Sequence, residues 1–231
     1  PVPDPAEDTE EQDQETDSSE EIEEDDEITE EERAQNTIKL NAKTSVKWSG
    51  SSIAVKWGAV KEADGYDIFA SKAGASDDML ATTITNGKKT SVKLSKLAGK
   101  KLDTGSVYRF CVRAYHIVNG DKQYIAIGQK LYLAGSKHKQ YTNVKSIRVN
   151  QSTIQLGKGK QIQIKATVVK QKSSKKLLPA KYGKSLRYTS TNETIATVTA
   201  KGRIKAKKKG SCYIYVTALN GVNRRIKVTV K

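Results

Sequence analysis

The sequence is short of long apolar runs, and it lacks the pattern of a signal peptide. No stretch approaches the roughly 20 consecutive apolar residues that a membrane-spanning helix needs, so we expect no membrane-spanning segment. The chain opens with Pro1-Val-Pro-Asp-Pro5 and has no basic start followed by an apolar stretch. This opening is typical of a mature chain whose signal or anchor has been removed. We therefore expect an extracellular or cell-surface location.

Residues that usually carry catalysis or bind metals are also scarce. The only two histidines, His116 and His138, stand apart from cysteines and carboxylates at metal-ligand spacing. The adjacent Asp77 and Asp78 fall in a predicted surface turn, and Gly157–Lys160 lacks the spacing of a phosphate-binding loop. No base is placed to activate a serine. We therefore predict that the chain is not an enzyme and has no catalytic residue, metal site or cofactor.

Carboxylates are scarce in one part of the chain, and basic residues are scarce in another. Residues 141–231 hold 22 Lys/Arg, but Glu193 is their only carboxylate side chain. Residues 1–35 hold 18 Asp/Glu and one basic residue, Arg33. Self-repulsion and the lack of a core predict that residues 1–36 form a disordered acidic spacer. Thr29 and Glu32 have the spacing of a helix capping box, but we give it little weight because the surrounding carboxylates repel one another.

Period-two alternation marks four short strands between residues 186 and 218. Leu186 and Tyr188 alternate with polar residues, Ala196 and Val198 follow a Ser-Thr-Asn turn, and further runs cover 203–207 and 212–218. In the last run Cys212, Ile214, Val216 and Ala218 share one face. Such alternation is typical of antiparallel strands with one face on a core and one in water.

Similar alternation between residues 37 and 135 predicts a β-sandwich of about 100 residues. The run IAVKWGAVKEADGYDIFAS, followed by Leu97 and YRFCVRA at 108–114, resembles a fibronectin type III domain. The resemblance implies that Trp57 is the core tryptophan of the second strand and that Tyr66 is buried. It also implies that the hydroxyl of Tyr108 caps an upstream backbone group, as in a tyrosine corner.

Residues 144–231 resemble a bacterial immunoglobulin-like domain of group 2. The hallmarks of that family match Gly159-Lys160, the Tyr188-x-Ser-x-Asn turn, Ala196-x-Val198, Gly202-x-Ile-x-Ala206 and Gly210. Tyr188 stands where the family often has tryptophan, and is expected in the core. The whole chain is then all-β, with two tandem antiparallel immunoglobulin-like sandwiches at 37–135 and 144–231. The segment 136–143 is the expected linker, and 171–183 the expected basic loop.

The two cysteines fall in different predicted domains. A disulfide needs Cα atoms within about 7 Å, so we expect none. The alternation places Cys212 in a core and leaves Cys111 as a half-exposed, inert thiol opposite the apolar face of its strand.

One group of residues is a candidate binding site, because cations and tyrosines alternate on the solvent side of neighbouring runs. If the strands are adjacent, they form a cationic surface with interleaved aromatics, suited to phosphate, carboxylate or sulfate polymers. The bland alternative, a solvated face with lysines that prevent aggregation, is the favoured one. The candidates are Arg203, Lys205, Lys207, Lys208, Lys209, Tyr213, Tyr215, Arg224 and Arg225.

Three classes of function remain open. The two resemblances imply a bacterial surface or secreted protein, because both families serve as adhesive modules, spacers or accessory modules. The first class is a non-catalytic binding or adhesion module whose partner is an anionic polysaccharide, a cell-wall polymer, or a host glycan or protein. The second is a purely structural spacer of a larger surface assembly. The third and least favoured is nucleic-acid binding, which the charge permits but no recognition motif supports.

Overall fold

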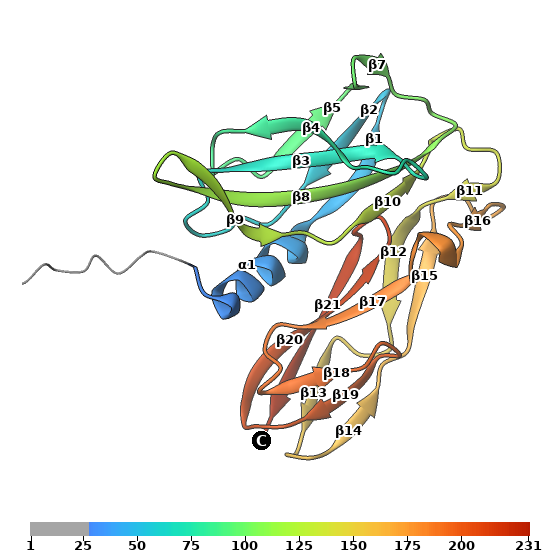
Figure 1. Cartoon of the computed structure of the whole chain (residues 1–231). Helices are drawn as coiled ribbons and strands as arrows, with labels where there is room; N and C mark the ends of the chain where they lie inside the picture. The colour runs from blue at the N-terminus through green and yellow to red at the C-terminus, as the bar shows by residue number, and fades with distance from the viewer. Residues whose placement is uncertain (1–27) are drawn as a thin grey trace, which may run out of the picture.

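The computed structural model describes residues 28–231 and consists mostly of β-strands. Two β-sandwiches follow one another along the chain and lie at an angle (Figure 1). The predicted fold class, two tandem antiparallel sandwiches, is confirmed, with two short parallel pairings as exceptions. Of the described helices, none has the length and apolar character to cross a membrane. The part of the predicted disordered tail at 1–27 lies outside the described residues.

The first sandwich contains a three-stranded sheet, a five-stranded sheet and a short strand pair. The three-stranded sheet has the order β1 (Ser45–Ser49), β2 (Ser52–Lys56), β5 (Ser91–Leu94). The larger sheet has the order β10 (Leu131–Ala134), β8 (Val107–Val118), β3 (Gly65–Lys72), β4 (Met79–Ile84), with β9 (Asp121–Ile127) also beside β8. The short pair is β6 (Lys96–Leu97) and β7 (Lys100–Lys101).

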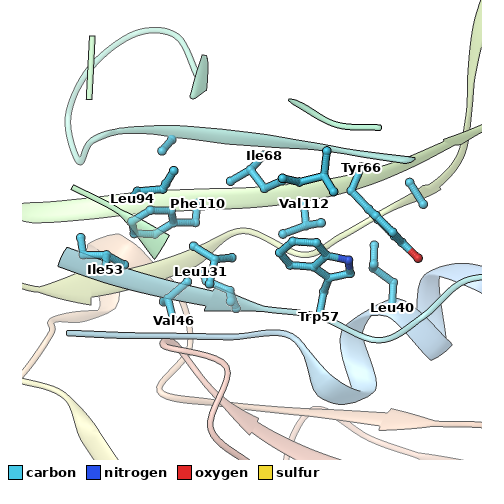
Figure 2. Close-up of a cluster of buried hydrophobic side chains, with 14 of the residues drawn as sticks. Leu40, Val46, Ile53, Trp57, Tyr66, Ile68, Leu94, Phe110, Val112 and Leu131 are labelled. Atoms are coloured by element: carbon cyan, nitrogen blue, oxygen red, sulfur yellow. The ribbon is translucent and has the colours of Figure 1, made fainter. Parts of the chain in front are cut away.

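Four aromatic side chains, Trp57, Tyr66, Tyr108 and Phe110, lie among the aliphatic ones in the core between these two sheets. Figure 2 shows the Trp57 ring lying between the sheets beside Tyr66 and Leu40. Trp57 is 2% exposed and its ring centroid lies 5.2 Å from that of Tyr66, which is fully buried. The Tyr66 hydroxyl accepts from the backbone N–H of Val60 and donates to the carbonyl of Gly87, both at 3.1 Å, so its polar end is satisfied inside the core.

Tyr108 makes the predicted corner contact. Its hydroxyl accepts a hydrogen bond from the backbone N–H of Asp103, five residues upstream, at 2.7 Å. The ring is 2% exposed and meets Trp48 edge to face, with 6.2 Å between centroids. The longer segment before Tyr108 therefore does not prevent the corner from forming.

A helix, α1 (Glu30–Lys43), replaces the last part of the predicted disordered tail, so that prediction is wrong for residues 30–36. The capping box is formed: the Thr29 side chain accepts from Glu32 N–H at 3.2 Å, and the Glu32 carboxylate accepts from Thr29 N–H at 3.1 Å. Carboxylates in the first turn interact favourably with the helix dipole. Leu40, which is fully buried in the first core, adds tertiary packing that outweighs the repulsion between the carboxylates.

The second sandwich has a four-stranded sheet facing a three-stranded one, with two additional strand pairs. The four-stranded sheet has the order β13 (Thr153–Leu156), β21 (Asn223–Val230), β20 (Gly210–Ala218), β17 (Leu186–Ser190). The three-stranded sheet has the order β14 (Gln161–Gln163), β19 (Arg203–Ala206), β18 (Ala196–Val198). The pairs are β12 (Val144–Val149) with β15 (Ala166–Lys170), and β11 (Tyr141–Thr142) with β16 (Lys176–Leu177); a short 3-10 helix, η1, covers Ala180–Tyr182.

The second core is aliphatic. Ile204, Ile214 and Val216 are fully buried between its sheets, and Cys212 is 4% exposed among them. Tyr188 lies at the edge of this cluster, half-buried, with its ring over Gly202. A Cβ at Gly202 would come within 2.9 Å of that ring, so the close approach requires a glycine.

Both cysteines are free and buried, so the expectation of a half-exposed Cys111 is wrong. Cys111 is 5% exposed, although it lies opposite the core face of β8. The connection from β9 to β10 crosses over it, and its thiol donates to the carbonyl of Gly128 at 3.1 Å. Burial raises the pKa of both thiols. Both side chains are therefore protected, unreactive thiols in the folded protein.

The two sandwiches meet in a joint formed by backbone hydrogen bonds and a small apolar cluster. Val46 N–H donates to the carbonyl of Asn220 at 3.0 Å, and Tyr132 N–H donates to that of Leu219 at 2.8 Å. The turn between β20 and β21 lies so close to the first sandwich that a Cβ at Gly221 would come 2.2 Å from the carbonyl oxygen of Thr44. The apolar cluster at the joint comprises Val107, Ala134, Leu178 and Leu219.

The expected linker, 136–143, is part of this ordered joint. Lys137 N–H donates to the carbonyl of Thr104 at 2.9 Å, and Tyr141–Thr142 form β11. The buried Asn143 side chain bonds both backbone groups of Ala134, at 2.8 and 2.9 Å. The exact division of the chain into domains stays a prediction, which the two separate core clusters support.

Candidate ligand-binding surface

The nine predicted site residues do not share one surface, because β19 belongs to one sheet of the second sandwich and β20 and β21 belong to the other. β19 pairs with β14 and β18, whereas β20 pairs with β21 and β17. The condition on which the predicted surface depended, adjacency of these two strands, is not met. The site is therefore split between the two outer faces of the second sandwich.

The crossing between the sheets takes place at residues 207–210. The backbone N–H groups of Lys207 and Lys208 donate to the carbonyl of Ile195, at 2.8 and 3.3 Å. Gly210 then turns with φ +147, and a Cβ there would come 3.0 Å from the Ile195 side chain. This crossing places the inward residues of β19 and β20 on opposite walls of one core, so their outward residues point in opposite directions.

One outer face combines tyrosines with cations. In the register of β20 and β21, Tyr213 lies opposite Lys227 and Tyr215 lies opposite Arg225. The Arg225 guanidinium lies 4.4 Å from the centroid of the Tyr213 ring, a cation–π contact. We call Tyr213, Tyr215, Arg225 and Lys227 the tyrosine–arginine face.

Lys227 belongs to this face but was missed in the sequence. The signal was present, because Arg225 and Lys227 alternate with the buried Ile226 and Val228. Arg224, which was predicted, does not belong to the face. Side chains of consecutive strand residues point to opposite sides of a sheet, and the register places Arg224 opposite the buried Val216, so this exposed arginine points away from the tyrosines.

The other outer face carries cations but no tyrosine. Arg203 and Lys205 are exposed, while Ile204 and Ala206 between them are fully buried. Their neighbours across the sheet are polar and uncharged: Gln163 lies opposite Arg203, and Gln161 and Thr197 lie opposite Lys205. Lys207, Lys208 and Lys209 continue the exposed cations along the crossing.

Within residues 28–231, ion pairs are found only in the first sandwich. Five ion pairs and the contact of His116 with Asp64 join side chains between Lys61 and Lys130. The second sandwich has many cations and only Glu193 to neutralise them. Its exposed lysines and arginines therefore carry positive charge that no carboxylate of residues 28–231 pairs with.

The residues considered for chemistry take structural positions. His116 Nδ1 lies 2.8 Å from the carboxylate of Asp64. Asp78 pairs with Arg109 and lies 3.7 Å from Lys130. His138 accepts two backbone hydrogen bonds through Nδ1, from Gln140 and Tyr141. Across residues 28–231 no group of three or more His, Cys, Asp or Glu side chains is gathered as a metal would require.

Comparison with protein families supports one of the two resemblances. Residues 143–230 match the family model described as bacterial Ig-like domain (group 2). The prediction for residues 144–231 is therefore confirmed, and the fibronectin type III assignment of the first sandwich stays a prediction. No curated protein matches the chain.

Solved structures match the chain only weakly. The S-layer protein rSbsC matches with 15% identity and a TM-score of 0.32, over 79% of this chain and 32% of that one. A C-terminal intimin fragment, solved in complex with the intimin-binding domain of the translocated intimin receptor, matches with 14% identity and a TM-score of 0.27, over 82% and 64%. The FN1–FN3 domains of chicken CNTN1 match with 12% identity and a TM-score of 0.28, over 81% and 66%. The chain thus spans about a third of the S-layer chain, and similarity at this level carries no functional argument.

Proposed function

We propose that this chain is a non-catalytic module of a bacterial surface or secreted protein, and that it binds anionic polysaccharides through the tyrosine–arginine face. The family match of the second sandwich supports a bacterial immunoglobulin-like module. The observation that carries the binding proposal is the contact of Arg225 with Tyr213 on an exposed sheet that also holds Tyr215 and Lys227.

The chemistry of this face suits a charged sugar chain. A tyrosine ring offers an apolar surface and a polar hydroxyl, which together match the faces and edges of sugar rings. Arg225 and Lys227 supply charge for carboxylate or sulfate groups, and the arginine is already held against a ring. A polymer that follows the sheet would meet both kinds of group in neighbouring rows.

The test compares two double variants that remove the same charge from opposite faces. Arg225→Gln with Lys227→Gln should weaken binding to heparin, used as a model sulfated polysaccharide, by about tenfold at 0.1 M salt. Arg203→Gln with Lys205→Gln should weaken it by less than about threefold. Tyr213→Ala with Tyr215→Ala, which changes no charge, should also weaken it. Equal losses from the two charge variants would mean that only net charge matters and would contradict the proposal.

A second function, a structural spacer, is supported by the joint. Backbone hydrogen bonds between the sandwiches, with a glycine wedged against Thr44, hold the two domains in a defined orientation. A spacer needs such stiffness and no ligand. Absence of binding to a panel of acidic and sulfated glycans, with DNA titrated at the same salt, would favour this alternative. Preference for DNA over the glycans would instead favour nucleic-acid binding.

A further inference from the structure

Two lysine-rich segments that are distant in the sequence come together at the joint. One is the connection 136–140 between the sandwiches, and the other is the loop from the end of β15 to β16. β11 and β16 pair in parallel, Tyr141 with Lys176 and Thr142 with Leu177, and Figure 1 shows them side by side next to the end of β10. We call the lysines of these segments, together with His138, the joint lysine cluster: Lys137, His138, Lys139, Lys170, Lys172, Lys175 and Lys176.

Several members of the joint lysine cluster are held in place by backbone carbonyls. The ammonium of Lys172 donates to the carbonyl of Ser136 at 3.3 Å, and that of Lys175 donates to the carbonyl of His138. Lys170 donates to the carbonyl of Lys175 at 2.7 Å, which fixes the loop itself. An ammonium has three N–H donors, so each of these lysines keeps two for a ligand. Side chains that are already ordered lose less entropy when they bind.

His138 is oriented in a similar way. Its Nδ1 accepts from the backbone N–H groups of Gln140 at 3.1 Å and Tyr141 at 3.0 Å, so the proton of the neutral ring resides on Nε2. The ring also stacks on Tyr141, with 4.9 Å between centroids. Nε2–H is then a further donor among the ammonium groups.

No carboxylate side chain within residues 28–231 neutralises the charges of this cluster. No ion pair among the described residues involves a member of the cluster, and Glu193 is the only carboxylate side chain between residues 141 and 231. Bringing like charges together opposes folding. A local conflict of this kind is typical of functional sites, where an external partner relieves it.

We infer that the joint lysine cluster is a second polyanion site, and that its occupant is a phosphodiester polymer without bases, of the kind that carries one negative charge on each repeating unit. The cluster contains lysines and a histidine but no arginine. Lysine binds phosphate as a point charge and does not require the planar, bidentate geometry that arginine matches. Tyr141 is the only aromatic residue in 136–142 and 170–177, and its ring lies against His138, so these segments present no second ring to a base or a sugar. This site does not depend on the tyrosine–arginine face.

The experiment measures binding of the full chain to long-chain inorganic polyphosphate, a base-free phosphate polymer, between 0.05 and 0.3 M salt. The variant is Lys137→Gln/Lys139→Gln/Lys176→Gln, because these three side chains are exposed and make no hydrogen bond to other groups within residues 28–231. Its charge-matched control is Lys93→Gln/Lys96→Gln/Lys100→Gln, three exposed lysines of the first sandwich. Thermal unfolding of both variants checks that the fold is retained.

The cluster variant should bind polyphosphate about tenfold or more weakly than the wild type at 0.1 M salt. The slope of log affinity against log salt should become shallower by about 2, because three phosphate contacts each contribute about 0.7 on a single-stranded polyanion. The control variant should change the affinity by less than about threefold. Heparin binding through the tyrosine–arginine face should be nearly unchanged in both, so failure of either site is recognised separately.

Two outcomes would overturn the inference. One is an equal loss of polyphosphate binding in the cluster variant and the control, because net charge alone would then explain it. The other is tighter binding of single-stranded DNA than of polyphosphate of equal charge, lost in the cluster variant, because the occupant would then be a nucleic acid.

Discussion

The two sandwiches differ in their ion pairs and in the residue types of their cores. The first joins most of its carboxylates to cations, and its core contains the aromatic residues Trp57, Tyr66, Tyr108 and Phe110 beside aliphatic ones. The second has an aliphatic core and leaves its cations without carboxylate partners among the described residues. The contrast shows that charges of the first sandwich are neutralised within it, whereas the cations of the second have no carboxylate partner within residues 28–231.

The largest effect should come from the aromatic core. Trp57→Ala should destabilise the first sandwich by about 3–5 kcal/mol, because it removes a buried ring from a closed core. Trp48, the only other tryptophan, also lies in the first sandwich and reports its unfolding by fluorescence. Alkylation of the two buried cysteines separates the domains. Cys111 should react at a lower urea concentration than in the wild type, and Cys212 should not; equal sensitisation of both would show that the sandwiches unfold as one unit.

The joint can be broken by adding one methyl group. Gly221→Ala should cost about 2–3 kcal/mol, because the new Cβ meets the Thr44 carbonyl and must force the turn away from the first sandwich. Gly159→Ala is the matched control, since Gly159 has φ +80 against +82 at Gly221 and nothing within 4 Å of the new Cβ. It should cost only about 1 kcal/mol for the backbone conformation. Urea unfolding measures both, and equal costs would mean that the joint contributes nothing to stability.

Low pH should destabilise the first sandwich more than the second. Burial raises the pKa of the Asp67 carboxyl, but hydrogen bonds from Thr83, Tyr124 and Lys122 together outweigh burial and lower it below the usual value near 3.8. A group with a lowered folded-state pKa stabilises the protein above its unfolded-state pKa, and this stability is lost as pH falls through the folded value. The first sandwich should therefore lose about 1–2 kcal/mol below about pH 4.

The second sandwich, with Glu193 as its only carboxylate side chain, should change much less over the same range. Urea unfolding at pH 6 and pH 2.5 checks the difference, followed by tryptophan fluorescence for the first sandwich and by NMR signals of the buried Ile214 and Val216 methyl groups for the second. Asp67→Asn should remove most of the acid sensitivity of the first sandwich. A parallel loss in both sandwiches would show that general charge repulsion, and not Asp67, is responsible.

The smallest effect concerns residues 1–27, which carry 15 Asp/Glu and no Lys/Arg. A tethered polyanion competes with external anions for the cations of the second sandwich at a millimolar effective concentration. Deleting residues 1–27 should strengthen heparin binding by about threefold at 0.05 M salt, with the gap closing as salt shortens the Debye length from about 14 Å towards 3 Å. Replacement by an uncharged Gly/Ser segment of equal length is the control. Unchanged heparin affinity after the deletion would leave the segment as a plain spacer.

Alternation in the sequence predicts which residues face inward, and the structure agrees for Ile204, Ala206, Cys212 and Ile214. It cannot assign a strand to a sheet, because the inward residues of either sheet look alike. The crossing between sheets at 207–210 was therefore not predicted. Because of this crossing, the predicted site residues lie on different faces of the second sandwich. Lys227 was recoverable from its alternation with Ile226, whereas the joint lysine cluster depends on the pairing of β11 with β16, which no local pattern contains.

Predictions made from neighbouring residues alone were also wrong where contacts between distant segments decide the structure. The carboxylates around Glu30 argued against a helix, but the buried Leu40 lies ten residues further along and its partners are in distant strands. Cys111 looked half-exposed because its strand alternates, yet the crossing connection at Gly128 covers it. In both cases the deciding contact comes from a segment that is remote in sequence.

The wedged turn at Gly221 has a mechanical consequence. The backbone bonds from Val46 to Asn220 and from Tyr132 to Leu219 join the far end of the β20–β21 hairpin directly to strands of the other sandwich. A force applied to the second sandwich is therefore transmitted to the first through this hairpin as well as along the chain. Because the two sandwiches are connected at two places, the angle between them would stay fixed under such a force.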